Sequence, residues 1–454
     1  MRKFGAIQVR DRHLPDAGAL ILALAGFLLL GMRQAFTVPL TFGQSMAQAI
    51  LAVCGAFWVL TRIAGARSPS HLRLLTGAMA LYLLASLVSY GAAMARGLPP
   101  KAVVLADRYV FADLTLASVV FFIITVVHSR RALELVLKGL VLGGTISGTF
   151  ALVQFGIGID LAPQFRLPGL KAEAFTLVTN LMREGLSRPQ GSAGHPLELS
   201  AVLTVLVPLA LGVTFSARAR GARYMPWAAC TLILTAGALV TISRSAVIGL
   251  GAAVLVMCWR WPVKRMAALL VGTGTVLGLA ALAQTKVVSA LVSSFANSSS
   301  DSSIASRAVG ARYVSDTYRE HLWFGQGVGS YPALDQPVLD SQYLSRLMET
   351  GLIGLVSYLV FLFVPLILAI RGAQVASRST AELSSAIAGS LIATIVIGLI
   401  LDTAGFAQIW YLTWLLIALA GAAWRLSKLE TQLLPIGNQP VAALPSHERT
   451  APPA

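Results

Sequence analysis

Three arginines lie in or beside apolar stretches, where a cation is stable only if it contacts water or an anion. Arg244 lies in the turn TISRS between two apolar runs, Arg188 in the glycine-containing turn LSRPQGSAGHP, and Arg307 on the apolar stripe of a predicted helix. A lone arginine at such a position is costly unless it finds a partner or a polar cavity. Turns with free backbone amides can also cradle an anion. The three positions therefore indicate a site for an anionic ligand, and Arg244 is the favoured contact to a phosphate group.

Each of these features also has an interpretation without chemistry. Arg244 could simply snorkel to the membrane interface. The predicted amphipathic helix 304–322 could lie in the interface with Arg307 and Arg312 as ordinary basic anchors. His195, at the end of the turn that carries Arg188, is more readily interpreted as a residue that starts a helix. The predicted stripe consists of Ile304, Arg307, Ala308, Ala311, Val314, Tyr318 and Leu322, with Arg312 and Arg319 on its flank.

A carboxylate follows a glycine-rich turn just ahead of an apolar run. Gly325, Gly327 and Gly329 precede Asp340 in the stretch FGQGVGSYPALDQPVLDSQYLSRLMETGLIG. The glycines neither follow a strand nor open a Rossmann helix, so they do not indicate a dinucleotide site. Asp340, placed where an external loop enters the bilayer, could act as a general base that takes a proton from an attacking hydroxyl.

Three further carboxylates lie in or beside apolar runs. Glu349 has two interpretations of equal weight, a catalytic group or a helix N-terminal carboxylate stabilised by the helix dipole. Asp113 and Asp402 fall within predicted spans, where they could pair with arginines or line a cavity.

The elements that must position these residues are membrane helices. Hydrophobic residues make up 56% of the chain and charged residues 12%, about half the charged fraction of a soluble domain. We predict an all-α polytopic membrane domain over residues 1–433 with about twelve spans. The predicted spans are 17–35, 40–61, 72–95, 107–128, 132–157, 197–217, 226–243, 245–259, 266–284, 347–370, 384–403 and 406–424.

Basic residues in alternate short loops place both termini in the cytoplasm. Two long segments, 158–196 and 285–346, then lie outside, and we expect them to carry short helices and the arginines. The net charge of +16 follows this topology and favours contact with membrane lipids, not with nucleic acid. Residues 434–454 are rich in proline and polar residues and are predicted to form a disordered cytoplasmic tail.

In this order the features resemble the O-antigen ligase/polymerase superfamily of bacterial membrane glycosyltransferases. The resemblance covers roughly residues 143–363. It rests on Arg188 in a glycine-rich turn before a span, Ser243-Arg244 in a tight outward turn, Arg307 upstream of FGQGVGSY, and the stretch DSQYLSRLMETGLIG.

This resemblance implies a helical fold of the GT-C type and an inverting, metal-independent transfer without cofactor or nucleotide sugar. The implied donor is a glycan on polyprenyl diphosphate, and the acceptor is a hydroxyl of a glycan, lipid or protein at the outer face of the bacterial cytoplasmic membrane. Arg188, Arg244 and Arg307 would hold the diphosphate and stabilise its departure, while Asp340 would deprotonate or orient the acceptor hydroxyl. The residues expected to bind substrate are Arg307, Arg312, Gly327, Gly329, Glu349 and His195.

The chain departs from the superfamily at one position that matters for chemistry. Asp340-Ser341 stands where lipopolysaccharide ligases typically have His-Asn. Because the reference pKa of a carboxylate is much lower than that of histidine, Asp340 would act as a base only if burial raised its pKa; otherwise it would orient the hydroxyl. Polymerisation of repeat units and ligation of finished chains both stay open.

Two functions of other classes remain as alternatives. A secondary transporter or flippase for an anionic glycolipid would concentrate polar residues and broken helices at the middle of the membrane. Here the arginines gather on the outer segments, which favours chemistry at the outer face. A non-catalytic assembly scaffold would tolerate the loss of Arg244 and Asp340.

Overall fold

The computed structural model describes residues 17–39, 43–65, 72–172, 182–183, 186–259, 261–267, 302–332 and 336–433. Its long helices are α1 (Ala17–Gly31), α2 (Met46–Ile63), α3 (Arg73–Arg96), α4 (Pro100–Val126), α5 (Arg130–Ile157), α6 (Pro196–Ala219), α7 (Met225–Val240), α8 (Arg244–Cys258), α12 (Gln342–Val375), α13 (Arg378–Gly398) and α14 (Ala407–Leu433). The shorter elements are α11 (Ser302–Thr317), the 3₁₀ helices η2 (Ala162–Gln164) and η5 (Tyr318–His321), and the strands β1 (Phe36–Thr37), β2 (Lys171–Ala172), β3 (Met182–Arg183) and β4 (Leu186–Ser187).

Every predicted span within the described residues corresponds to one of the long helices. Eight of these helices are long and apolar enough to cross a membrane, and α1, α7 and α8 are shorter apolar helices. The chain is therefore an all-α polytopic membrane protein, as predicted. The predicted span 266–284 and the predicted tail 434–454 lie almost entirely outside the described residues. The total of about twelve spans stays a prediction.

Two predicted boundaries are wrong for the same reason. We expected Asp402 inside a span, but α13 ends at Gly398 and Asp402 lies in the turn before α14. We expected a span to begin at residue 347, but α12 begins at Gln342. The Gln342 side chain accepts hydrogen bonds from the Ala404 amide and the Thr403 hydroxyl. Polar residues at these helix ends are buried against one another, so hydropathy alone misplaces the ends.

The outer segments carry short strands as well as the expected short helices. β1 pairs with β2 in an antiparallel sheet, with Phe36 opposite Ala172, and β3 pairs with β4. The β1–β2 pair ties the segment that follows α5 to the residues that follow α1, whereas β3 and β4 are close neighbours in sequence. They add to the all-α architecture without changing it.

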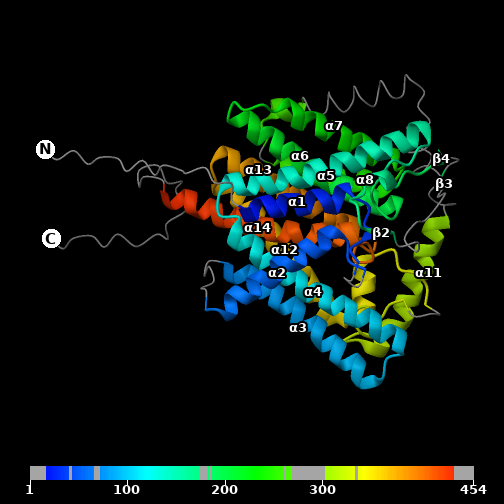
Figure 1. Ribbon diagram of the computed structural model, residues 1–454. Coiled ribbons are helices and arrows are strands. Elements are labelled where there is room, and N and C mark those ends of the chain that lie inside the picture. Colours follow the sequence, from blue (N-terminus) through cyan, green and yellow to red (C-terminus); the bar gives the residue numbers. More distant parts are fainter. Residues whose placement is uncertain are drawn as a thin grey trace, which may run out of the picture.

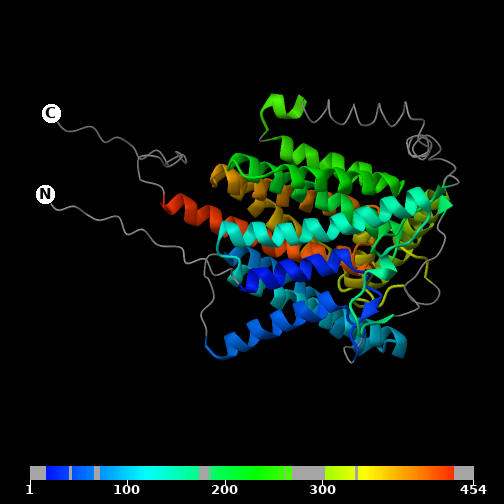
Figure 2. The same ribbon diagram turned by 45° about the horizontal axis from the view of Figure 1, so that its top comes forward.

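The long helices lie side by side in one bundle, and the elements of the outer segments gather at one end of it (Figure 1). α11 and the strands β2 to β4 lie at the end where α6 and α12 begin, whereas α14 finishes at the opposite end. The same arrangement is seen after a turn of the view in Figure 2. The two stretches that carry the candidate residues, far apart in sequence, therefore meet at one end of the molecule.

The centre of the bundle is formed by α6, α13 and α14. In these helices 83% to 89% of the apolar window is buried, against 22% in α2 at the periphery. The exposed side chains of α2 include Val53, Phe57 and Leu60. Because lipid tails are as apolar as these side chains, an exposed apolar face is stable in a bilayer. The burial pattern therefore separates the central helices from those with exposed apolar faces at the periphery.

The external helix α11 exists as predicted, but its buried stripe differs from the expected one. Ala308 and Ala311 are exposed, whereas Gly310 and Val314 are buried. Val314 packs with Leu339 and Met348 in a small core outside the main bundle. Arg307 is half-buried on this side of α11. The predicted contrast between Arg307 and the exposed Arg312 and Arg319 is thus confirmed, although the register of the stripe is not.

A break inside α12 connects the external loop to the bundle. Gly351 has φ 66° and ψ −167°, which interrupts the helix. In a regular helix the amides of Leu352 and Ile353 would donate to the carbonyls of Met348 and Glu349. Instead they donate to the carbonyls of Leu322 and Trp323, at 2.9 and 3.3 Å. The vacated carbonyls of Met348 and Glu349 accept from the amides of Gln326 and Gly327, at 2.8 and 2.9 Å. The loop thus replaces the lost helical bonds one for one.

We predict that Gly351→Ala destabilises the protein strongly. The backbone of Gly351 lies in a region essentially reserved for glycine, which costs other residues roughly 1–3 kcal/mol, and an added Cβ would overlap the Trp323 backbone. The measurement is the unfolding temperature of the purified protein in detergent. The matched control is Gly77→Ala, since Gly77 is helical and exposed with open space around its Cβ. Equal unfolding temperatures for the two variants would contradict this account of the break.

Candidate functional site

Asp340 and Arg307 meet just before the start of α12. The Arg307 Nε atom lies 3.5 Å from the Asp340 carboxylate, and the two side chains are 31% and 29% exposed. Arg307 also donates to the carbonyl of Ile400, in the turn between α13 and α14, at 3.3 Å. The external helix, the start of α12 and this turn therefore converge on one ion pair that a ligand can still reach.

The two arginine turns upstream are joined to each other. The Arg188 Nε atom donates to the carbonyl of Thr241 at 2.9 Å, and Thr241 begins the turn in which Arg244 starts α8. Ile242, between them, has a positive φ of 49°, which is uncommon for a β-branched residue. A strained turn of this kind persists only where its surroundings hold it. The structure thus joins the turn that carries Arg188 to the turn that leads into Arg244, and a common role for the two arginines stays a prediction.

His195 lies beside these arginines and starts α6. Its Nδ1 atom accepts a hydrogen bond from the Leu197 amide at 3.1 Å. Burial and the positive charge of Arg188 lower the pKa of His195 from 6.5 to about 4. His195 is therefore neutral near neutral pH and serves as the cap that the sequence favoured. Its predicted contact with substrate stays a prediction.

The turn between α13 and α14 bridges the two groups of residues. Its Phe406 ring lies 5.6 Å from the His195 ring, while its Ile400 carbonyl contacts Arg307. Just beyond the turn, the Gln408 amide donates to Glu198 at 2.7 Å, so the bridge is fixed to α6. The turn thus contacts His195 through Phe406 and Arg307 through Ile400.

Arg346 is a residue that sequence reasoning did not single out. It is fully buried, and its Nε and Nη2 atoms have no hydrogen-bond partner among the described residues. Four aromatic rings surround its guanidinium, at centroid distances between 4.9 and 5.9 Å. Ring faces attract cations, which offsets part of the cost of burying this charge. The four rings belong to Tyr82, Tyr109, Tyr358 and Trp410.

Glu349 completes the ion pair of Arg346. The carboxylate lies 3.4 Å from the Arg346 Nη1 atom and accepts hydrogen bonds from the amides of Gly329 and Tyr331. It lies inside α12, just before the break, and not in the first turn of the helix as one interpretation expected. The geometry therefore makes Glu349 a brace between the glycine-rich turn and Arg346, and a contact with substrate stays a prediction.

Asp113 and Asp402 support this buried charge from two sides. Asp113 accepts from the Tyr82 hydroxyl at 2.6 Å and from the Trp410 indole at 3.2 Å, so it orients two of the rings around Arg346. Asp402 accepts from the Ser345 hydroxyl at 3.1 Å. Burial raises the pKa of Asp402, and the charge of Arg346 opposes this shift. Asp402 thus interacts with an arginine, as one of its predicted roles required, whereas Asp113 contacts aromatic side chains.

The glycines of the turn have packing contacts. Gly327 has φ 130°, and a Cβ there would overlap Ala93 of α3 at 2.6 Å. Gly329 has φ 69°, and its Cβ would meet Tyr109 of α4 at 2.8 Å. The turn therefore lies directly against α3 and α4. Substrate binding by these two glycines, and by the exposed Arg312, stays a prediction.

Residues 229–359 match the family model described as O-antigen ligase. This part of the chain is therefore similar to the O-antigen ligase family. This confirms the resemblance to the O-antigen ligase/polymerase superfamily, and the match lies within the predicted core 143–363. A search of curated proteins finds no match.

The O-antigen ligase match includes most of the candidate residues. Arg244, Arg307, Asp340, Arg346 and Glu349 all fall within residues 229–359. The helices that complete their surroundings, α3, α4, α6 and α14, lie outside the matched segment. The remaining two candidates, Arg188 and His195, lie upstream of it. The matched segment therefore lies within a larger bundle, whose other helices supply some of the contacts of these candidate residues.

We expect the buried pair to show strong coupling. Arg346→Met should leave Glu349 buried without its cation, and losing one partner of a buried pair costs about 3–5 kcal/mol. Arg346→Met/Glu349→Gln, which removes both charges, should recover much of the lost stability. Unfolding temperatures of the two single variants and the double variant in detergent measure this. If the double variant lost as much as the sum of the single variants, the pair would not be coupled.

We also predict a pH dependence that comes from His195. Between pH 6.5 and about pH 4 the unfolded chain binds a proton at this residue that the folded chain does not. Stability should therefore fall as the pH falls through this window. His195→Asn keeps an acceptor for the helix start but does not titrate. Its unfolding temperature should decrease less between pH 6.5 and pH 4 than that of the wild type, and parallel curves would refute the assignment.

Proposed function

We propose that this protein transfers a glycan from polyprenyl diphosphate to an acceptor hydroxyl at the outer face of the bacterial cytoplasmic membrane, in cell-surface polysaccharide biosynthesis. The observation that carries this proposal is the convergence of Arg188, Arg244, Arg307 and Asp340 from separate loops at one end of the bundle. A lipid diphosphate carries more than one negative charge, and arginine binds phosphate oxygens in pairs. The O-antigen ligase match supports the same chemistry.

The reaction assigns a role to each charged group. Asp340 takes the proton of the acceptor hydroxyl, or orients this hydroxyl, while its oxygen attacks the anomeric carbon of the donor. The bond between that carbon and the diphosphate oxygen breaks, and the electron pair leaves with the polyprenyl diphosphate. Arg188, Arg244 and Arg307 stabilise the charge that develops on the departing diphosphate. Attack opposite to the leaving group inverts the anomeric configuration.

The ion pair between Arg307 and Asp340 is one that a bound donor could displace. Arg307 contacts Asp340 and the Ile400 carbonyl at 3.3 to 3.5 Å, and about a third of its side chain is exposed. A diphosphate that engaged Arg307 would compete with Asp340 for the guanidinium. Donor binding would thereby release the carboxylate toward the acceptor hydroxyl, so both substrates would be in place before the proton moves.

The break in α12 favours an enzyme over a transporter. In transporters the free ends of broken helices bind substrate or ions. Here the carbonyls of Met348 and Glu349 already accept from Gln326 and Gly327. Glu349 O also accepts from the Ser89 hydroxyl at 2.8 Å. The break thus anchors a loop and presents none of these groups to a transported ligand.

The orientation in the membrane is also a proposal. The arginines of the outer segments and Asp340 lie at the end where α12 begins, and α14 finishes at the other end (Figure 1). The other end carries many exposed basic residues, among them Arg131, Arg218 and Arg371. Basic loops face the cytoplasm, so we place both termini there and the site on the outer face.

The test is a transfer assay with purified protein in nanodiscs. Polyprenyl-diphosphate-linked oligosaccharide is supplied without nucleotide sugar and with EDTA present. We expect Arg307→Gln, Arg244→Gln and Asp340→Asn each to lower the initial rate on the order of 10²–10³-fold, as loss of one charge-stabilising group does. Arg319→Gln is the matched control, since Arg319 is an exposed cation on the same external segment as Arg307.

The products separate the remaining possibilities. Chains that lengthen in steps indicate a polymerase, and a single transfer to an added acceptor indicates a ligase. Wild-type rates in all three site variants would disprove the assignment of these residues. Movement of the lipid-linked glycan across liposomes without any transfer would establish the transporter instead.

A further inference from the structure

A basic cavity of about 630 Å³ lies at the end of the bundle opposite the candidate site. Three separate elements line it: the end of α6, the segment 261–267, and the start of α13. Its volume falls within the range of about 300–1,000 Å³ that is typical of ligand sites. The lining residues are Phe215, Arg218, Ala219, Trp261, Pro262, Lys264, Arg265 and Arg378.

Arg265 is fixed in place on the wall of this cavity. Its guanidinium lies 4.4 Å from the Phe215 ring centroid and 5.6 Å from the Trp261 ring centroid. It also donates two hydrogen bonds to the Glu382 carboxylate, at 2.9 and 3.1 Å. A guanidinium held between rings and a carboxylate loses little further freedom when it meets an anion.

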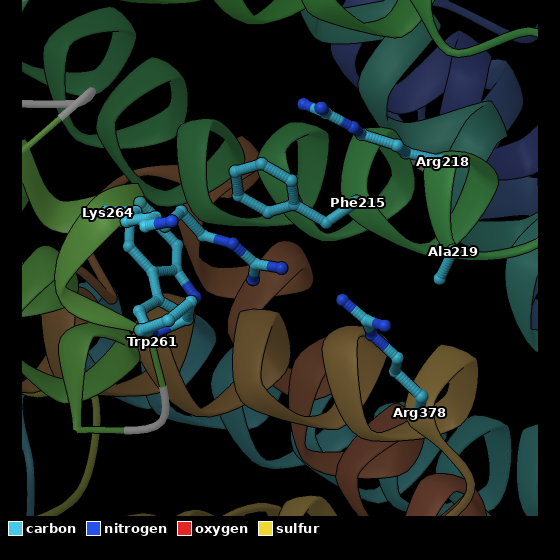
Figure 3. A pocket seen from close by; sticks show the side chains of 8 residues that line it. Phe215, Arg218, Ala219, Trp261, Lys264 and Arg378 are labelled. Carbon is cyan, nitrogen blue, oxygen red and sulfur yellow. The ribbon is translucent and has the colours of Figure 1, made fainter.

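The other cations face the cavity without a balancing acid. Figure 3 shows Arg218 and Arg378 extending from their helices toward the space beside Phe215 and Trp261. Within the described ranges, no carboxylate forms an ion pair with Arg218, Lys264 or Arg378, and all three are exposed. Four cations and one acid, Glu382, leave three positive charges at the cavity. An anion with more than one charge would balance them.

The position of the cavity matches the headgroup level of a membrane. α13 runs from Arg378 at the cavity to Gly398, whose carbonyl contacts Ser341 beside the candidate site. A helix of 21 residues is about 31 Å long, roughly the thickness of the hydrocarbon layer. The cavity and the candidate site therefore lie at opposite membrane surfaces. Trp261 and the arginines are the residue types that gather at such a surface.

We propose that this cavity binds the headgroup of an anionic phospholipid that carries two phosphates. Basic pockets between membrane helices on the cytoplasmic side bind such headgroups. The general excess of basic residues in cytoplasmic loops explains why cations occur at this end. It does not explain why cations from three elements surround one cavity with aromatic walls. The proposal is independent of the transfer reaction.

Native mass spectrometry of the detergent-purified, full-length protein tests the proposal. The probes are diphosphatidylglycerol, phosphatidylglycerol, phosphatidylcholine and inorganic pyrophosphate. We expect the wild type to bind diphosphatidylglycerol most tightly. Arg218→Gln/Arg378→Gln should lower this affinity at least on the order of tenfold, because each basic residue near a headgroup contributes measurably. Both residues are exposed, so the double variant should fold; its elution profile and unfolding temperature verify this.

The matched control is Arg371→Gln, which removes an exposed cation from the last turns of α12 but does not line the cavity. It should bind diphosphatidylglycerol like the wild type. Equal affinity in the double variant and the wild type would overturn the site. Pyrophosphate binding as tight as that of the lipid would overturn the assignment to a lipid and leave a soluble polyphosphate as the ligand. The glycan transfer assay is unaffected by either result.

Discussion

The hydrogen bonding of a membrane backbone is the constraint on which the candidate site depends. A helix that breaks within an apolar span leaves amides and carbonyls that lipid cannot satisfy. At Gly351 the missing partners come from the loop segment 322–327, whose peptide groups exchange bonds with those of α12. This exchange holds α11, which carries Arg307, against the helix that begins beside Asp340. Both Gly325 and Gly351 need to be glycine. Each has a positive φ, and each lies directly against the backbone of the opposite segment.

A buried charge fixes the same region from the other side. Arg346 loses its hydration, and such a charge is stable only where opposite charge and dipoles replace the water. Glu349, Asp402 and the surrounding rings provide this replacement. Since Glu349 also binds the amides of the glycine-rich turn, the charge network and the backbone exchange stabilise one another. The flexible residue types of the turn are therefore held in one conformation.

The structural features that could be predicted from the sequence are those that depend on residues close together along the chain. Runs of apolar residues predict the spans because each helix forms its backbone hydrogen bonds within its own segment. The stripe around Arg307 predicts the helix α11 for the same reason. The register of that stripe was wrong, since Leu339 and Met348, which are distant in sequence, decide which face is buried. Arg346 was missed because its partners Tyr82, Tyr109 and Trp410 come from three other helices. The polar ends of α12 and α13 were misplaced because their partners are likewise distant.

Several basic residues at the two ends of the molecule differ in how they are paired, and this difference fits the function that we propose for each end. At the outer end, Arg188 and Arg307 rest on carbonyls and on a carboxylate of the protein. In the transfer that we propose, the site must release a diphosphate after each turnover, so its cations need internal partners to which they can return. At the opposite end, Arg218, Lys264 and Arg378 are exposed around a cavity. A lipid headgroup is present in the membrane at all times, so cations that bind it need no such partner. The cavity holds one such pair, Arg265 with Glu382, beside three cations that form no ion pair within the described residues, so the proposed lipid site retains a positive charge for a headgroup.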